Sequence, residues 1–182
     1  MILTGNKITK EVKNKKIKIS PFEESKITTN SYDLDLGNII IRYKTNLIDP
    51  RERSPYEEIE IPENGLTLNQ GEFVLGHSKE QIGSDFYVPL IHGKSGTARM
   101  GLFVHVTADL IDIGSYGVTT FQLYATLPVR LYPGMSIAQV SFWVPYGDIV
   151  LYDGKYQNST GPRPSMGYKD FKRDSFRNDQ NE

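Results

Sequence analysis

The segment HGKSGTARMG, which begins at His92, carries groups that can bind an anion. It places Lys94, Ser95 and Arg99 between glycines. Because Ser95 and Arg99 are four residues apart, a single helical turn would put a hydroxyl and a guanidinium on one face, beside free backbone N–H groups. Charge-assisted hydrogen bonds from such groups suit a phosphate. The sequence therefore predicts a phosphate site here.

A carboxylate and an amide follow this segment along the chain. The apolar run at residues 102–106 predicts a buried strand, which leads to Asp112, and Gln122 lies on the next strand-like segment. The stretch from His92 to Gln122 thus leads from cations to a carboxylate.

The segments that must position these residues have the pattern of an all-β domain. Residues 66–143 form a series of short apolar runs bounded by Gly, Pro or Asp, which is typical of a barrel or jelly roll. Earlier segments, KIKISPF and NSYDLDLGNIIIRYK, also predict strands, the second with a Gly-Asn turn inside it. Ile8 and Val12 have helical spacing and predict a short helix within residues 4–16, with Thr4 as its cap.

Composition limits the classes of function. The chain has 182 residues, with 21 Lys and Arg against 22 Asp and Glu and a net charge of −1. We expect one domain and no nucleic-acid partner, because no overall basic field exists. No apolar run approaches membrane-spanning length, so we expect no membrane partner and a cytoplasmic location. With no Cys and three His, a structural zinc site is disfavoured.

The region after residue 150 differs in composition. It is poor in aliphatic residues and rich in Gly, Pro, Ser and charge. Such a segment is disordered unless a ligand or a neighbouring subunit orders it. We therefore divide the chain into a β-domain with an N-terminal helix, residues 1–150, and a C-terminal tail, residues 151–182.

Several segments resemble one known family in type and order. GKSGTARMGLFVHVTADLID resembles the signature of the dCTP deaminase branch of the trimeric dUTPase and dCTP deaminase superfamily. The opening MILTGNKI, the NSYDLDLG segment, the LYPGMSIAQVSF strand and the KYQNSTGPRPS tail are similar to that family too. The resemblance covers nearly the whole chain, and the tail is most similar to the bifunctional, dUMP-forming deaminases.

The resemblance implies a distorted jelly-roll β-barrel of the trimeric dUTPase type. It also implies a homotrimer with active sites at subunit interfaces, Mg²⁺ on the triphosphate, a tail that closes over the active site, and dTTP as a possible inhibitor. Residues carried over for the phosphates are Lys94, Ser95, Gly96, Arg99 and Lys155. Residues carried over for the sugar and base are Ala108, Leu110, Asp112, Tyr116 and Gln139, with Asp112 also orienting a water.

One residue departs from the family pattern at the position of the chemistry. Where the deaminases carry a glutamate five residues after a glycine, Gln122 follows Gly117 here. An amide has no titratable proton near neutral pH, so it cannot shuttle a proton from water to leaving ammonia. Smaller departures are Ser115 and Ser159, where the family more often has an aromatic residue and a glutamine; Tyr116 could replace that aromatic residue.

The sequence therefore favours a dUTP diphosphatase that forms dUMP for thymidylate synthesis, since the amide of Gln122 can donate to the C4 carbonyl of uracil. Two alternatives remain open. One is a dCTP deaminase, with or without dUMP as its product, in which Gln122 is a variant or introduced residue. The other is a nucleotide-binding regulatory protein without catalysis.

Judged without the resemblance, each residue has an ordinary structural explanation. Lys94 and Arg99 would be solvated charges, because most charged side chains are. Asp112 would be a turn residue, and His105 a core histidine. The joint occurrence of several segments in family order outweighs these explanations, although no single motif would suffice.

Overall fold

The structure is a computed structural model that describes residues 1–105 and 107–171. Val106 and residues 172–182, the end of the predicted tail, lie outside the described residues. The α-helices α1 (Gly5–Lys13) and α2 (Ser95–Arg99) and a short 3₁₀ helix, η1 (Glu24–Lys26), accompany a predominantly β chain, and residues 168–171 in the tail are also helical. No helix in the described ranges is long and apolar enough to cross a membrane.

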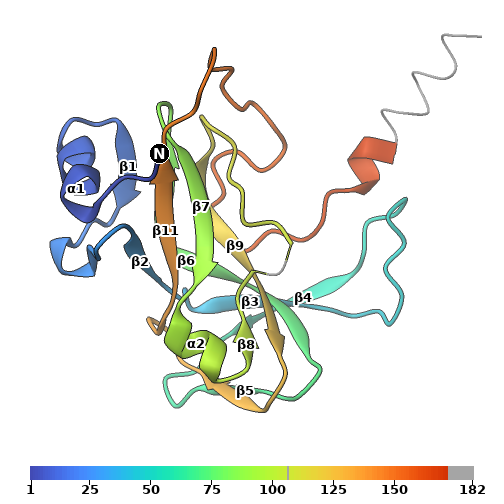
Figure 1. The fold of residues 1–182 in the computed structure, drawn as a ribbon. Helices are drawn as coiled ribbons and strands as arrows, with labels where there is room; N and C mark the ends of the chain where they lie inside the picture. The colour runs from blue at the N-terminus through green and yellow to red at the C-terminus, as the bar shows by residue number, and fades with distance from the viewer. Residues whose placement is uncertain (106, 172–182) are drawn as a thin grey trace, which may run out of the picture.

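The strands form three sheets (Figure 1). In the six-stranded sheet the order is β4-β3-β6-β9-β8, and β1 pairs with β6. A three-stranded sheet has the order β2-β11-β7, and β5 pairs with β10. The bounds are β1 (Ile17–Ser20), β2 (Tyr32–Asp35), β3 (Ile39–Tyr43), β4 (Tyr56–Glu60), β5 (Leu66–Leu68), β6 (Phe73–Ser84), β7 (Val88–Gly93), β8 (Leu102–Phe103), β9 (Tyr116–Ala125), β10 (Val129–Leu131) and β11 (Ser136–Trp143).

The predicted mostly β class is confirmed. Among residues 1–105 and 107–171, the strand pairings leave the three sheets separate, so they do not close into one continuous hydrogen-bonded barrel. A single hydrophobic core joins them instead: Leu34 of β2, Val140 of β11 and Phe121 of β9 are all fully buried in it. Burying these apolar faces is what holds the small sheets against the large one.

The N-terminal helix α1 forms where the helical spacing predicts it. Ile8 is fully buried and Val12 packs against the core, so the apolar face of the helix lies on the domain. Lys10 and Lys13 occupy the last turn, where cations favour the helix dipole. Thr4 is the N-cap residue, as predicted, but its side chain makes no capping hydrogen bond; its carbonyl accepts from the amide of Ile8 at 2.9 Å.

The apolar run at residues 102–106 was predicted as one buried strand, and this is wrong at Val104 and His105, which belong to no strand. Strand β8 contains only Leu102 and Phe103. From Thr107 the chain is a loop that pairs locally with β7 through an isolated bridge between Leu90 and Leu110. A short apolar run cannot distinguish a strand from a loop that lies along a strand edge, because periodicity alone does not decide it.

A β-bulge in β6 shapes the neighbouring strand β9. The register between these strands shifts between His77 and Gln81. Ser78, which is fully buried, donates to the carbonyl of Glu80 at 2.6 Å and accepts from the amide of Thr119 at 2.8 Å. Bulges re-aim side chains near functional sites. Here the bulge faces the part of β9 that lines the main cavity.

Candidate functional site

A cavity of about 710 Å³ lies between β9, the loop at residues 107–115 and the C-terminal tail. Its size is in the range of sites for small organic ligands. Hydroxyl and apolar side chains dominate its wall, and Asp112 and Arg163 are its charged residues among the lining positions. The other lining residues used below are Tyr43, Thr107, Ala108, Leu110, Ser115, Tyr116, Thr119, Thr120, Gln122, Tyr152, Tyr156, Ser159 and Ser165.

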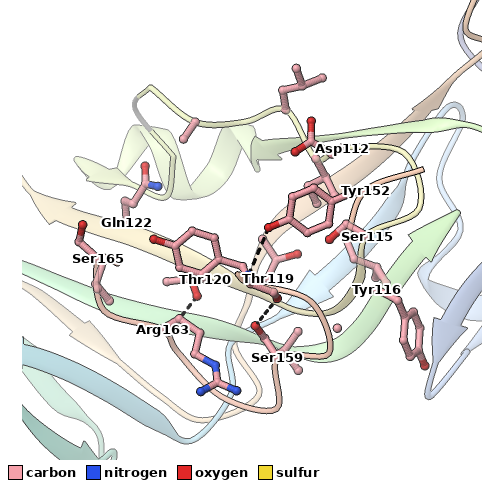
Figure 2. A pocket seen from close by; sticks show the side chains of 18 of the residues that line it. Asp112, Ser115, Tyr116, Thr119, Thr120, Gln122, Tyr152, Ser159, Arg163 and Ser165 are labelled. Atoms are coloured by element: carbon pink, nitrogen blue, oxygen red, sulfur yellow. Dashed lines mark hydrogen bonds between the residues drawn. The ribbon is translucent and has the colours of Figure 1, made fainter. Parts of the chain in front are cut away.

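Strand β9 supplies one wall. Thr120 and Gln122, two residues apart on the strand, both line the cavity. The backbone amide of Gln122 donates to the carbonyl of Val104 at 2.9 Å, which ties β9 to the chain just before the loop. The side chain of Gln122 is partly buried, and Figure 2 shows it beside Ser165. The structure therefore places Gln122 in the cavity, as the sequence predicts.

The loop at residues 107–115 supplies a second wall and carries three predicted residues, Ala108, Leu110 and Asp112. It is attached to β7, because the amide of Ile91 donates to the carbonyl of Asp109 at 2.9 Å. The Asp112 side chain is exposed and lies well apart from Gln122 across the cavity (Figure 2). A carboxylate and an amide thus face opposite parts of any bound ligand.

The tail supplies the third wall, and hydrogen bonds attach it to the β-domain. The amide of Val118 donates to the carbonyl of Ser159 at 2.9 Å, in parallel pairing beside β9. Further along, the amide of Arg163 donates to Thr120 Oγ1 at 3.0 Å and that of Ser165 to Tyr43 Oη at 2.9 Å. The tail of this chain therefore covers the cavity of the same chain.

Tyr116 lines the rim, but its ring does not face the cavity. Figure 2 shows the ring pointing away from the other labelled side chains, and Lys18 Nζ lies 5.9 Å from the ring centroid. Its amide donates to Gln157 Oε1 at 2.7 Å. The expected aromatic contact with base or sugar is therefore not formed by this ring; Tyr152 of the tail brings an aromatic ring to the cavity instead.

The predicted phosphate residues do not line the cavity of their own chain. Ser95, Gly96 and Arg99 form the single helical turn that the spacing predicts, α2, and Arg99 Nη1 donates to the carbonyl of Ser95 at 3.1 Å. Lys94 precedes this turn and is ion-paired with Asp33. The structure thus keeps the predicted phosphate residues together, but it places them outside the cavity that Asp112 and Gln122 line.

Two further predicted residues also lie outside the cavity lining. Lys155 is ion-paired with Asp170 within the tail. Gln139 is on β11, and its Oε1 accepts from Ser31 Oγ at 2.8 Å. Within one chain, both side chains therefore contact other residues of the fold and do not face the cavity.

His105 is close to the site although the sequence suggested only a core role. Its ring packs edge-on against Phe121, with centroids 5.9 Å apart. Both ring nitrogens are buried and have no hydrogen-bond partner among the described residues. Burial lowers the pKa of His105 below its ordinary value and outweighs the opposing effect of the nearby Gln122 side chain, whose contact with the ring falls short of a regular hydrogen bond, so the ring is neutral near pH 7. A buried polar group that lacks a hydrogen-bond partner and lies near a cavity is a candidate for a functional residue.

Sequence reasoning missed most of the tail residues that line the cavity. Tyr152, Arg163 and Ser165 were included only in a tail expected to fold over nucleotide. The GPRPS segment was the available signal, because two prolines stiffen the chain around Arg163. Tyr43, which anchors Ser165, had no signal, because the contact depends on the folded tail.

We next consider whether side chains of the cavity could hold a metal ion. In residues 1–105 and 107–171, no group of three or more His, Asp or Glu side chains is placed to hold a metal ion. Asp112 and the hydroxyls of the cavity are oxygen donors, which fit a hydrated Mg²⁺ that arrives on a triphosphate.

Comparison with known proteins gives a consistent result. Residues 2–144 match the family model for dCTP deaminase-like proteins. The chain is 41% identical over 174 residues to a dUMP-forming dCTP deaminase of Clostridium beijerinckii, which covers 95% of this chain and 100% of that protein. It is 39% identical over 174 residues to the protein of the same name from Cytophaga hutchinsonii, with 95% and 100% covered.

A solved structure shares the fold. The 2′-deoxycytidine 5′-triphosphate deaminase of Agrobacterium tumefaciens superposes with a TM-score of 0.64 at 20% identity, covering 79% of this chain. Our chain spans about half of that one, 48% of its length. With the fold, the match over residues 2–144 and the identity along nearly the whole chain, this protein belongs to the dCTP deaminase-like family.

Proposed function

We propose that the protein hydrolyses dUTP to dUMP and diphosphate, and so supplies dUMP for thymidylate synthesis. The observation that carries this proposal is the position of Gln122 in the cavity wall, where a neutral amide faces the ligand space. The relatives support the product, since they are named as dUMP-forming deaminases. The cavity, at about 710 Å³, has room for a nucleoside.

Gln122 favours uracil and disfavours deamination. Its amide nitrogen carries two donors, which can bond to the C4 carbonyl of uracil, whereas a carboxylate would repel that oxygen. Deamination of cytosine requires a group that takes a proton from water and delivers it to ammonia, and an amide cannot do this. In this proposal Gln122 therefore binds the base, and no reaction takes place at the base.

The reaction takes place at the phosphates. Asp112, across the cavity from Gln122, orients a water and accepts its proton. The water oxygen forms a bond to the α-phosphorus, the bond from that phosphorus to the bridging oxygen breaks, and diphosphate leaves. Mg²⁺ bound to the triphosphate neutralises its charge.

The phosphate residues come from a neighbouring subunit in this proposal. Lys94, Ser95, Gly96 and Arg99 lie outside the cavity of their own chain, so a homotrimer that joins α2 of one chain to the cavity of the next would complete the site. Lys155 of the tail would leave Asp170 for the phosphates. In this site dTTP would compete with dUTP.

A dUMP-forming dCTP deaminase is the second candidate, favoured by the names of relatives that cover 95% of the chain. The test is to incubate the protein with Mg²⁺ and either dUTP or dCTP and to separate products by ion exchange. Our proposal expects dUMP and diphosphate from dUTP, with no ammonia from dCTP. Ammonia from dCTP would establish the second candidate, and tight nucleotide binding without any product would indicate a regulatory protein.

The subunit arrangement has its own test. Light scattering should give three times the mass of the 20.6 kDa chain. Mixing a Lys94→Met variant with an Asp112→Asn variant should restore part of the activity, because a mixed trimer contains some sites with both residues intact. A monomer, or mixtures without restored activity, would contradict sites shared between subunits.

A further inference from the structure

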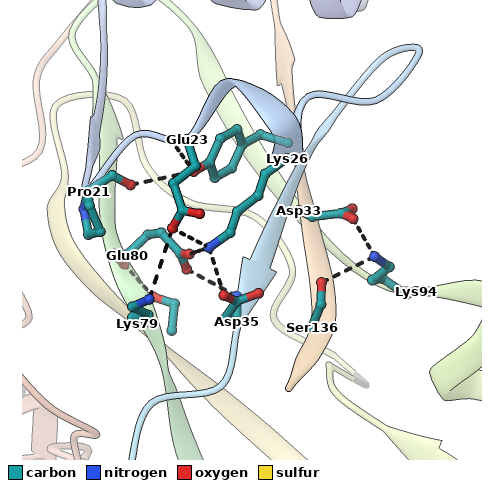
Figure 3. Close-up of polar contacts among 11 residues, drawn as sticks. Pro21, Glu23, Lys26, Asp33, Asp35, Lys79, Glu80, Lys94 and Ser136 are labelled. Carbon is teal, nitrogen blue, oxygen red and sulfur yellow. Dashed lines mark hydrogen bonds and ion pairs between the residues drawn. The ribbon is translucent and has the colours of Figure 1, made fainter. Parts of the chain in front are cut away.

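A carboxylate holds the first cation of the phosphate segment in place. Lys94 lies between β7 and α2, and its backbone amide donates to the carbonyl of Ile137 at 3.0 Å. Its ammonium donates to Asp33 of β2 and to Ser136 Oγ, the latter at 3.1 Å (Figure 3). Three strands, β2, β7 and β11, therefore converge on this one side chain.

Asp33 depends on Lys94 more than an ordinary surface carboxylate would. Its side chain is only 19% exposed. Oδ2 accepts from Lys94, whereas Oδ1 is buried and has no hydrogen-bond partner among the described residues. A carboxylate in such a place is costly unless a cation compensates it. The Asp33–Lys94 ion pair is therefore needed by the folded chain and is not an incidental surface contact.

The contact leaves Lys94 able to bind a ligand. An ammonium has three N–H donors, and Asp33 and Ser136 take two of them. The Lys94 side chain remains 32% exposed, so the third donor can reach solvent or an anion. Lysine otherwise has a long flexible stem that loses rotamer entropy when it is fixed. Asp33 and Ser136 have already fixed it before an anion arrives.

We propose that Asp33 is a positioning residue, which holds the Lys94 ammonium at the start of α2 so that its third N–H faces the triphosphate. This rests on the proposed placement of phosphates at Lys94 to Arg99 and adds a residue to that site. Asp33 itself does not touch the substrate. Its effect passes through Lys94, so it should act on the phosphates and not on the nucleoside.

The test measures binding, so it does not depend on turnover. Calorimetry with diphosphate and Mg²⁺ gives a dissociation constant for the phosphate end, and deoxyuridine gives one for the base end. Asp33→Ala should weaken diphosphate binding about tenfold and leave deoxyuridine binding unchanged. Asp33→Asn, whose carbonyl oxygen can still accept from Lys94, should lose less. Asp85→Asn, at an exposed ion pair with Lys18, is the matched control and should change neither constant.

A double-mutant cycle identifies the partner. In a Lys94→Met background, Asp33→Ala should cause no further loss, because the group it positions is gone. Fully additive losses, unchanged diphosphate binding in Asp33→Ala, or tighter binding in either Asp33 variant would overturn the proposal. So would a wild-type protein that does not bind diphosphate. Asp33-dependent diphosphate binding in a protein that fails to cleave dUTP would instead reject the proposed function alone.

Folding is checked by thermal unfolding of each variant. Where Asp33→Ala does not fold, Ser136→Ala takes its place, since Ser136 is exposed and makes the second contact to Lys94. It should weaken diphosphate binding in the same direction by a smaller factor, again only when Lys94 is present. An equal loss in the Lys94→Met background would overturn the proposal.

Discussion

Ser165 and Tyr43, which are 122 residues apart in the chain, are joined by a hydrogen bond of 2.9 Å from the backbone amide to the phenol oxygen. The bond fixes the tail to β3 beside Gln122 (Figure 2). Because the tail forms one wall of the cavity, its attachment decides whether the cavity is closed.

Removing the Tyr43 hydroxyl should loosen the tail. Tyr43→Phe removes the acceptor for the Ser165 amide, a loss of about 1 kcal/mol, so amide exchange at Ser165 should become about fivefold faster. Tyr56→Phe is the control, because Tyr56 pairs with Tyr43 across β3 and β4 and no described residue bonds to its hydroxyl. Equal exchange at Ser165 in all three proteins would show that the bond does not hold the tail.

A side chain at Gly117 should displace the tail from β9. Gly117 has φ 147°, and a Cβ there would lie 2.6 Å from the amide nitrogen of Ser159. Gly117→Ala should raise the KM for dUTP about tenfold or more, because strain of this kind costs about 1–3 kcal/mol. Gly161→Ala, in the tail with no atom within 4 Å, should behave as wild type. An unchanged KM for Gly117→Ala would mean that the tail does not need this contact.

Glu80 should be important for stability. It is fully buried, and its carboxylate accepts from Lys26 Nζ at 2.7 Å and from the Asp35 amide at 3.1 Å (Figure 3). Burial lowers the pKa of Lys26, but the hydrogen bonds that its ammonium donates to Asp35, Glu80 and Glu23 outweigh this effect and raise the pKa above its ordinary value. The ammonium is therefore charged, and it needs its partners.

Glu80→Gln should reduce the free energy of unfolding by about 3 kcal/mol, because it leaves a buried charge partly uncompensated. Asp85→Asn, which breaks the exposed pair with Lys18, should cost less than about 1 kcal/mol. Urea unfolding of the two variants gives both values. Similar small losses in both would show that the buried cluster contributes no more than a surface pair.

Acidification should destabilise the protein through its buried histidines. Burial lowers the pKa of His77 and of His105 below the ordinary value of 6.5. Between the lowered value and about 6.5, the unfolded chain binds protons that the folded chain does not, so stability falls as the pH falls through this window.

His77→Asn tests this pH dependence, because an asparagine amide can still donate to the carbonyl of Ser78, as the ring Nδ1 does at 2.8 Å. The decrease in Tm between pH 7 and pH 5 should be smaller in this variant than in wild type. A decrease of the same size would assign the acid sensitivity to other groups.

Local patterns predicted much of this molecule. Helix α1, the turn α2 and most strands follow from spacing and from Gly and Pro boundaries, because those signals act within a few residues. The bulge at Ser78 could not be predicted, since a register shift exists only when β6 meets β9. The same holds for the loop from Thr107, which backbone contacts of Asp109 and Leu110 attach to β7.

The candidate site was predicted in part for a similar reason. The family resemblance identified Asp112 and Gln122, which residue types alone would have left as a turn residue and a solvent-facing amide, and both line the cavity. Tyr116 lines the cavity, but its ring lies against Lys18, because one step along a strand reverses the side of a side chain. Tyr43 and His105 gain their importance from contacts far away in sequence, and those contacts are visible only in the folded chain.

The most direct test of the account is product analysis of wild type and Gln122→Glu, each incubated with Mg²⁺ and dCTP or dUTP. We predict that wild type forms dUMP and diphosphate from dUTP and releases no ammonia from dCTP, because Gln122 cannot transfer a proton. Gln122→Glu should gain ammonia release. Ammonia from dCTP with the wild-type protein, or no dUMP from dUTP, would contradict the account.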